Sequence, residues 1–226
     1  MARQARVDVP DIPYHVINRA VGRLRIFRSD KDYQLFLQLL KEAKEKTEMN
    51  ILAFVVMPNH WHLVLLPENT DDLKKFMHLL TNAHTRKVHT ITKTIGTGPL
   101  YQGRYKSFLV NDDTHLLTVI KYVERNPVRA GLSQRVGEWR WWSGWVREYG
   151  STEHKKLLSD GPTPLPRNYR SWVNTEDKDD VIIRLRTSVN KGTPFGGDDW
   201  VNAMIDTYKL KATTRGTGRP KGSKNK

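Results

Sequence analysis

Hydrophobic and polar positions along the first 131 residues switch between the two-residue period of a strand and the longer period of a helix. Four segments have the strand pattern: 14–20, 51–57, 60–66 and 104–110. Three segments have the helical pattern, each after a capping residue: from Asp30 to near Asn50, from Asp72 to about His89, and from Thr114 to about Arg125. The predicted order is therefore β-α-β-β-α-β-α.

This order predicts an α+β fold of ferredoxin-like type, an antiparallel sheet with helices on one face. Pro58-Asn59 is a turn signal, so the strands on either side of it should form a hairpin. We assign this unit, which contains the candidate catalytic residues, to residues 1–131.

The pattern changes after Gly131. Four tryptophans fall within residues 139–145, and packing in a core is favoured for them over stacking on bases. A proline-rich stretch follows at 161–169, and then helical patterns at 176–187 and 198–210. We therefore assign 132–214 to a Trp-rich, mostly helical or irregular C-terminal extension. Residues 215–226 are basic and glycine-rich, and we expect a tail that is disordered without a partner.

Composition narrows the function classes. Hydrophobic residues make up 38% of the 226 and charged ones 27%, as in an ordinary globular protein. With no cysteine, disulfides and thiolate metal sites are excluded. The apolar stretch 51–66 is interrupted by polar residues and cannot cross a membrane. Because the N-terminus also has no secretory signal, we expect a cytoplasmic protein.

The net charge points to a polyanionic partner. Lys and Arg total 38 against 24 Asp and Glu, a formal charge of +14. Nucleic acid is the commonest partner of so basic a chain, and the alternatives are a merely soluble basic protein or one that binds anionic membranes.

His60 and His62 form the first candidate site. Residues i and i+2 of a strand point to one face, so the two imidazoles should lie side by side as metal ligands, while Trp61 enters the core. The alternative is two unrelated polar residues on a solvated strand face.

Tyr122 and Asn126 form the second candidate site, because residues four apart share a helical face. Alone they could be a boundary tyrosine and a helix-terminal residue before Pro127. Joined to the histidines, the amide oxygen of Asn126 would complete a three-ligand site suited to Mg²⁺ or Mn²⁺. Tyr122 would then stand beside a metal-bound phosphate as a covalent nucleophile.

Four stretches resemble the HUH-superfamily single-tyrosine transposases, above all the REP-associated tyrosine transposases of bacteria. They are VPDIPYHVINRAVGRLRIFRSDKDY, MPNHWHLVLLP, GPLYQGRYKSFLV and YVERNPVRAG, which together span about residues 6–131. The resemblance implies that His60, His62 and Asn126 bind the metal and that Tyr122 is the catalytic nucleophile.

The implied activity is metal-dependent cleavage and rejoining of single-stranded DNA at palindromic REP-type hairpins, through a 5′-phosphotyrosine intermediate. The implied partner is single-stranded DNA with such hairpins and not a membrane. We expect a bacterial, nucleoid-associated enzyme that acts as a monomer or a homodimer.

Several alternatives stay open from the sequence. The chain could be a nucleic-acid-binding module without catalysis, a phosphodiesterase that uses water as nucleophile, or a replication or conjugation relaxase. The intact His, His, Tyr and Asn set argues against the first, and the close local match favours a transposase over a relaxase.

Basic residues are the candidates for DNA contact, although most surface Lys and Arg only keep a protein soluble. The chosen set is Arg19, Arg23, Arg104, Lys106, Arg125, Arg129, Arg219 and Lys221. Arg104 and Lys106 stand out because they share one strand face near the predicted site. The tail residues Arg219 and Lys221 could bind phosphates, inhibit the enzyme or simply be solvated.

Overall fold

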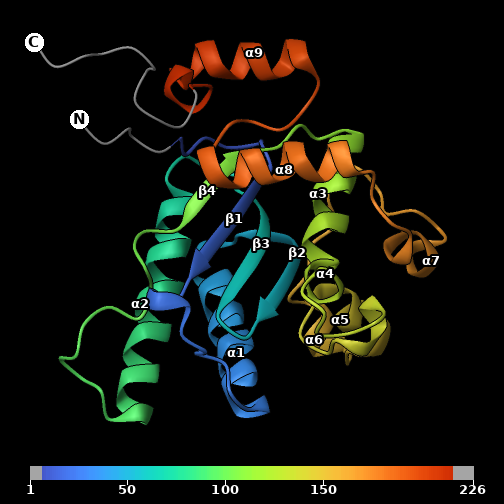
Figure 1. Cartoon of the computed structure of the whole chain (residues 1–226). Coiled ribbons are helices and arrows are strands. Elements are labelled where there is room, and N and C mark those ends of the chain that lie inside the picture. Colours follow the sequence, from blue (N-terminus) through green and yellow to red (C-terminus); the bar gives the residue numbers. More distant parts are fainter. Residues whose placement is uncertain (1–6, 216–226) are drawn as a thin grey trace, which may run out of the picture.

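The computed structural model describes residues 7–215, and the predicted order of elements is confirmed (Figure 1). The first unit contains β1 (Tyr14–Arg19), α1 (Asp30–Thr47), β2 (Asn50–Met57), β3 (His60–Leu66), α2 (Asp72–Thr92), β4 (Lys106–Leu109), α3 (Thr114–Glu124) and α4 (Asn126–Arg129). The C-terminal part contains α5 (Ser143–Tyr149), α6 (Thr152–Lys155), α7 (Tyr169–Asn174), α8 (Asp179–Lys191) and α9 (Asp198–Thr207). Short 3-10 turns, η1 to η3, lie at Val21–Arg23, Val136–Glu138 and Lys211–Thr213. Within residues 7–215, no helix combines the length and apolar character needed to span a membrane.

The four strands form one antiparallel sheet in the order β2-β3-β1-β4. This is the strand order of the predicted ferredoxin-like sheet, and β2 and β3 form the predicted hairpin. β3 is a central strand, paired with β2 on one side and β1 on the other. Its residues are therefore fixed in register by two sets of backbone hydrogen bonds.

The sheet separates two hydrophobic clusters. Trp61 and Leu63 of β3 lie in the cluster formed with α1 and α2, whereas Val64 lies in the cluster formed with α3. Helices α1 and α2 pack against each other over the first face. The second face is covered by α3 and by parts of the C-terminal extension. The sequence pattern predicted helices on one face only and did not predict this second layer.

Some boundaries differ from the sequence prediction for local reasons. α2 continues to Thr92, where the hydroxyl groups of Thr90 and Thr92 donate to carbonyls one turn back. α8 runs from Asp179 to Lys191 instead of 176–187, and it ends at Gly192, whose φ of 77° is a left-handed C-cap.

The Trp-rich segment packs into the fold, which confirms the packing interpretation over base stacking. The backbone N–H of Val56 in β2 donates to the carbonyl of Trp141 at 2.8 Å, and Val55 forms a bridge with Trp142. Both tryptophans are buried. The segment therefore covers the outer edge of β2, which would otherwise be an open sheet edge.

A buried carboxylate joins α3 to the C-terminal extension. Glu124, fully buried, accepts hydrogen bonds from Ser143 of α5, Tyr169 of α7 and Arg147 of α5, the last at 3.0 Å. Arg147 also donates to the carbonyl of Leu52 in β2. Because a buried carboxylate is costly without partners, this network fixes α3 relative to the sheet.

Replacing Arg147 with Ala should lower the free energy of unfolding by about 3–5 kcal/mol, because Glu124 would stay buried without its cation. Urea unfolding followed by tryptophan fluorescence measures the loss. Lys211→Ala is the matched control, since Lys211 and Asp206 form an exposed pair at 3.3 Å and such pairs contribute about 0–1 kcal/mol. Equal losses in the two variants would show that the Glu124 network does not hold α3.

Candidate active site

The two histidines of β3 lie side by side. Their ring centroids are 5.1 Å apart, and Trp61 between them is buried on the opposite face of the sheet. This is the arrangement that the two-residue period of a strand predicts. In the antiparallel register, β1 places Arg19 opposite His60 and Ile17 opposite His62.

Each histidine uses its Nδ1 in a contact with another side chain. His60 Nδ1 lies 2.6 Å from Asn59 Oδ1, and His62 Nδ1 lies 2.8 Å from Nε2 of His15 in β1. The other nitrogen of His62, Nε2, is buried and has no hydrogen-bond partner among the described residues. A buried polar atom without a partner in a folded protein calls for an explanation, and a bound ion is one.

Burial keeps these imidazoles neutral. It lowers the pKa of His15 and of His60 to about 3, with Arg19 adding to the effect at His60. Burial also lowers the pKa of His62 well below its usual value, and the neighbouring His15, His60 and Arg129 lower it further. A neutral imidazole has the free lone pair that a metal ligand needs.

Tyr122 of α3 lies beside this cluster. Its ring centroid is 6.3 Å from those of both His62 and His15, and the guanidinium of Arg129 lies 4.1 Å from the centre of the Tyr122 ring. Burial raises the pKa of the Tyr122 phenol, while the positive charges of Arg129, Arg186 and Arg19 lower it. The phenol is therefore in a partly apolar site with cations around it.

Asn126 is fixed one turn after Tyr122. Its Nδ2 donates to the carbonyls of Tyr122 and Val123 at 3.1 and 3.0 Å. These bonds span the break between α3 and α4, where Pro127 interrupts the helix. Since the amide nitrogen is engaged, the oxygen is the atom left to act as a ligand.

A second ionic cluster surrounds Asp177, in the loop before α8. Lys121, Arg125 and Arg129 approach its carboxylate at 3.2, 3.7 and 3.8 Å. Arg125 is buried and donates to the carbonyl of Val173. DNA contact by Arg125, as predicted from the sequence, would need this pair to open.

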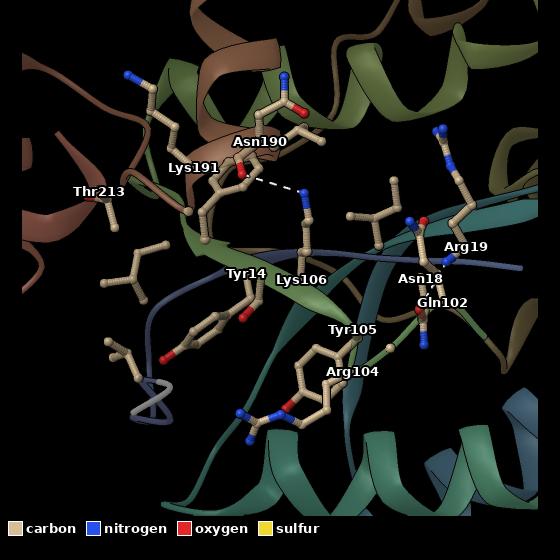
Figure 2. Close-up of a pocket in the computed structure, with 18 of the residues that line it drawn as sticks. Tyr14, Asn18, Arg19, Gln102, Arg104, Tyr105, Lys106, Asn190, Lys191 and Thr213 are labelled. Atoms are coloured by element: carbon tan, nitrogen blue, oxygen red, sulfur yellow. Dashed lines mark hydrogen bonds between the residues drawn. The ribbon is translucent and has the colours of Figure 1, made fainter. Parts of the chain in front are cut away.

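A groove of about 740 Å³ runs along β4, the edge strand (Figure 2). Four of the predicted DNA contacts line it: Arg19, Arg23, Arg104 and Lys106. Lys191 at the end of α8 adds a fifth cation, and none of the described residues that line the groove is acidic. Phe108, whose ring lies 4.8 Å from that of His15, also lines it, so the groove borders the histidine cluster.

The structure brings His60, His62 and Tyr122 together, and the groove brings together four of the basic candidates. Arg219 and Lys221 lie outside the described residues. The sequence reasoning missed His15, Asn59 and Asp177. His15 could have been found, because the predicted ferredoxin-like topology places β1 beside β3, and the period of β1 puts His15 and Arg19 on one face.

The donor set consists of nitrogen and oxygen atoms, which divalent ions bind. Among residues 7–215, no group of three or more His, Cys, Asp or Glu side chains could hold a metal ion, so a third protein ligand would have to be a side chain of another type, such as an amide. Two neutral imidazoles, one with a buried free Nε2, lie side by side, and the Asn126 amide one turn after Tyr122 is the candidate third donor. The residues present are therefore compatible with such an ion.

Comparison with known proteins agrees with these features. A provisionally named REP-associated tyrosine transposase of Haemophilus influenzae is 26% identical over 112 residues, which are 46% of this chain and 64% of that protein. The REP-associated tyrosine transposase of Escherichia coli K12 is 25% identical over 109 residues, 47% of this chain and 61% of that protein. The chain therefore spans less than two thirds of the length of these curated relatives.

A solved structure shares the fold. The structure of a REP-associated tyrosine transposase bound to a REP hairpin superposes with a TM-score of 0.57 at 17% identity, over 79% of this chain and 93% of that one. The family model for IS200-like transposases matches residues 8–126, more than half of the chain. The resemblance inferred from four sequence stretches is confirmed, and the chain belongs to the IS200-like transposase family.

Proposed function

We propose that this protein is a metal-dependent transposase and endonuclease that cuts and rejoins single-stranded DNA with Tyr122 as nucleophile. One observation above all supports this: Tyr122 lies against His62, whose Nε2 is buried and free of any described partner. A candidate nucleophile whose ring lies 6.3 Å from that of a candidate metal ligand supports covalent phosphoryl transfer.

His60, His62 and Asn126 are the proposed ligands of Mg²⁺ or Mn²⁺. When bound, such an ion polarises a phosphate oxygen and fixes the phosphate in place. Mg²⁺ or Mn²⁺ is proposed because three protein ligands leave positions open for phosphate oxygens, and both ions prefer oxygen ligands.

In the proposed reaction, Tyr122 Oη attacks a phosphorus of the DNA strand. The bond from phosphorus to the 3′-oxygen breaks as the new P–O bond to tyrosine forms, giving a 5′-phosphotyrosine and a free 3′-OH. The phenol loses its proton and the leaving 3′-oxygen takes one up, so charge balances. Attack by a 3′-OH reverses the step and rejoins strands without an energy source, because the phosphodiester is replaced by another phosphate ester.

Arg129 and Arg19 are proposed to stabilise the phenolate form of Tyr122 and the negative charge of the phosphate. A buried phenol resists ionisation, and the two guanidiniums oppose that resistance. The same cations would attract the phosphate that Tyr122 attacks.

The groove along β4 is proposed to hold the unpaired strand that leads to Tyr122. Its cations match a phosphate backbone, and Arg19 connects the groove to the histidines. By analogy with the named relatives, the strand would flank a REP-type palindromic hairpin. A bacterial, nucleoid-associated setting follows from the proposed binding to DNA.

The test of the mechanism is Tyr122→Phe, which removes one oxygen atom. We expect cleavage of a labelled single-stranded hairpin to be lost, while binding stays within about 1 kcal/mol of wild type because the hydroxyl is a minor part of a large polar interface. A covalent protein–DNA adduct on a denaturing gel should form with wild type only. Cleavage that persists in Tyr122→Phe would favour a water nucleophile, and hairpin binding with no cleavage by wild type would favour a binding module.

Arg129→Met tests the activation of the phenol. Removing a cation beside Tyr122 destabilises the phenolate, so the pKa of Tyr122 should rise, and the pH at which cleavage becomes fast should rise with it. Selective ¹³Cζ labelling of tyrosine and NMR titration measures the pKa. Arg184→Met on α8 is the control, because Arg184 lies over Phe195 and not over Tyr122. If the pKa of Tyr122 is the same in the two variants, Arg129 has no part in activating the phenol.

The groove is tested by a double substitution of Arg104 and Lys106 with Gln. Removing one phosphate contact should flatten the dependence of log K on log salt by about 0.7 for a single strand, so the pair should change the slope by about 1.4. Fluorescence anisotropy with a single-stranded oligonucleotide across a salt series measures it. The control substitutes Lys46 and Lys155, which are exposed and do not line the groove. An equal change of slope in both proteins would mean that net charge, and not the groove, binds the strand.

A further inference from the structure

We propose that His15 and Asn59 are positioning residues that fix which nitrogen of His62 and of His60 faces the metal. Each accepts a hydrogen bond from Nδ1 of its partner histidine, so that both histidines present Nε2 to one ion. This inference rests on the proposed metal site and adds two residues that fix the tautomer and orientation of its ligands.

The orientation of Asn59 follows from its own contacts. Its Nδ2 donates to the carbonyl oxygen of Arg23 at 3.1 Å, and a carbonyl oxygen can only accept. The amide oxygen is therefore the atom that faces His60 Nδ1 at 2.6 Å. Because an amide oxygen also only accepts, the proton must be on His60 Nδ1, and a neutral imidazole then has its free lone pair on Nε2.

The contact between His15 and His62 allows two arrangements. Both rings are buried and neutral, and one proton lies between His15 Nε2 and His62 Nδ1, which are 2.8 Å apart. If His62 donates, its Nε2 has a free lone pair and can bind a metal. If His15 donates, His62 has its proton on Nε2 and cannot.

A bound ion would favour one of these two tautomeric arrangements over the other. Without it, each leaves one buried N–H unpaired: on His15 Nδ1 in the first and on His62 Nε2 in the second, the two nitrogens without described partners. A metal bond would need the lone pair of His62 Nε2 and would therefore select the first.

The surroundings of His15 hold its ring in place for this task. His15 is fully buried on β1, which is paired with β3 and β4, and its ring packs against Phe108. Since its Nε2 is already bonded to His62, His15 touches the ligand and not the ion. Partners of this kind fix the tautomer and the ring plane of a metal-binding histidine.

Binding of Mn²⁺ to the full-length protein, followed by EPR, tests the proposal with a readout other than cleavage. His15→Leu, similar in size but without an acceptor, and Asn59→Ala should each raise the Kd for Mn²⁺ by about 10–100-fold. His15→Gln and Asn59→Asp keep an acceptor oxygen and should restore most of the affinity. Thermal unfolding of each variant identifies any loss of fold.

The outcomes separate this inference from the proposed function. If His62→Ala binds Mn²⁺ as tightly as wild type, the metal site itself is wrong. If His62→Ala loses the ion but His15→Leu and Asn59→Ala both bind it as tightly as wild type, the positioning role is overturned and the metal site stands. Equal weakening in His15→Leu and His15→Gln would also overturn it, because packing and not the acceptor would then matter.

A second measurement does not depend on variants that fold. In ¹⁵N-histidine NMR of the wild-type protein with Mg²⁺, which is diamagnetic, His60 and His62 should both have their proton on Nδ1. His60 should have it there without metal as well, because Asn59 alone determines it. A proton on Nε2 of either residue in the Mg²⁺-bound protein would contradict the proposal.

Discussion

The pleat of β3, held at the centre of the sheet, is the constraint from which the rest of this structure follows. Hydrogen bonds to β2 and β1 on its two sides fix its register, so alternate side chains must face opposite layers. Trp61 enters the layer under α1 and α2, where its Nε1 donates to the hydroxyl of Tyr101 at 2.9 Å. His60 and His62 are thereby turned to the other face. A slip of one residue would turn the histidines into the layer of α1 and α2 and Trp61 into the layer of α3.

The opposite face becomes a site because α3 is held against it by ionic contacts with the C-terminal extension. Glu124 accepts hydrogen bonds from side chains of α5 and α7. Asp177 forms ion pairs with Lys121, Arg125 and Arg129. Burying charges is costly, so each carboxylate is stabilised by having several partners. The helix with Tyr122 is thus fixed by residues far from it in sequence, which ties the geometry around the phenol to the integrity of the extension.

The site combines neutral histidines with fixed positive charges. The histidines are neutral because burial opposes their protonation, while Arg19 and Arg129 supply fixed positive charge around Tyr122. Lys106 of β4 and Arg104 just before it add positive charge to the groove, where Figure 2 shows their side chains pointing in different directions. The surrounding cations favour the arrival of a phosphate, and the same cations oppose further positive charge at His60 and His62.

The sequence by itself determined the elements, their order and the pairing of residues that share an element. The period of a strand places His60 beside His62, the helical period places Tyr122 near Asn126, and the charge of the chain points to nucleic acid. These are local relations, set by backbone geometry over a few residues. Only the tertiary structure decided what meets across elements: that His15 of β1 reaches His62, that Arg129 lies over Tyr122, and that Asp177 and Glu124 are partners of α3. The physical reason is that such contacts depend on sheet register and on packing between segments far apart in the chain, which no local period encodes.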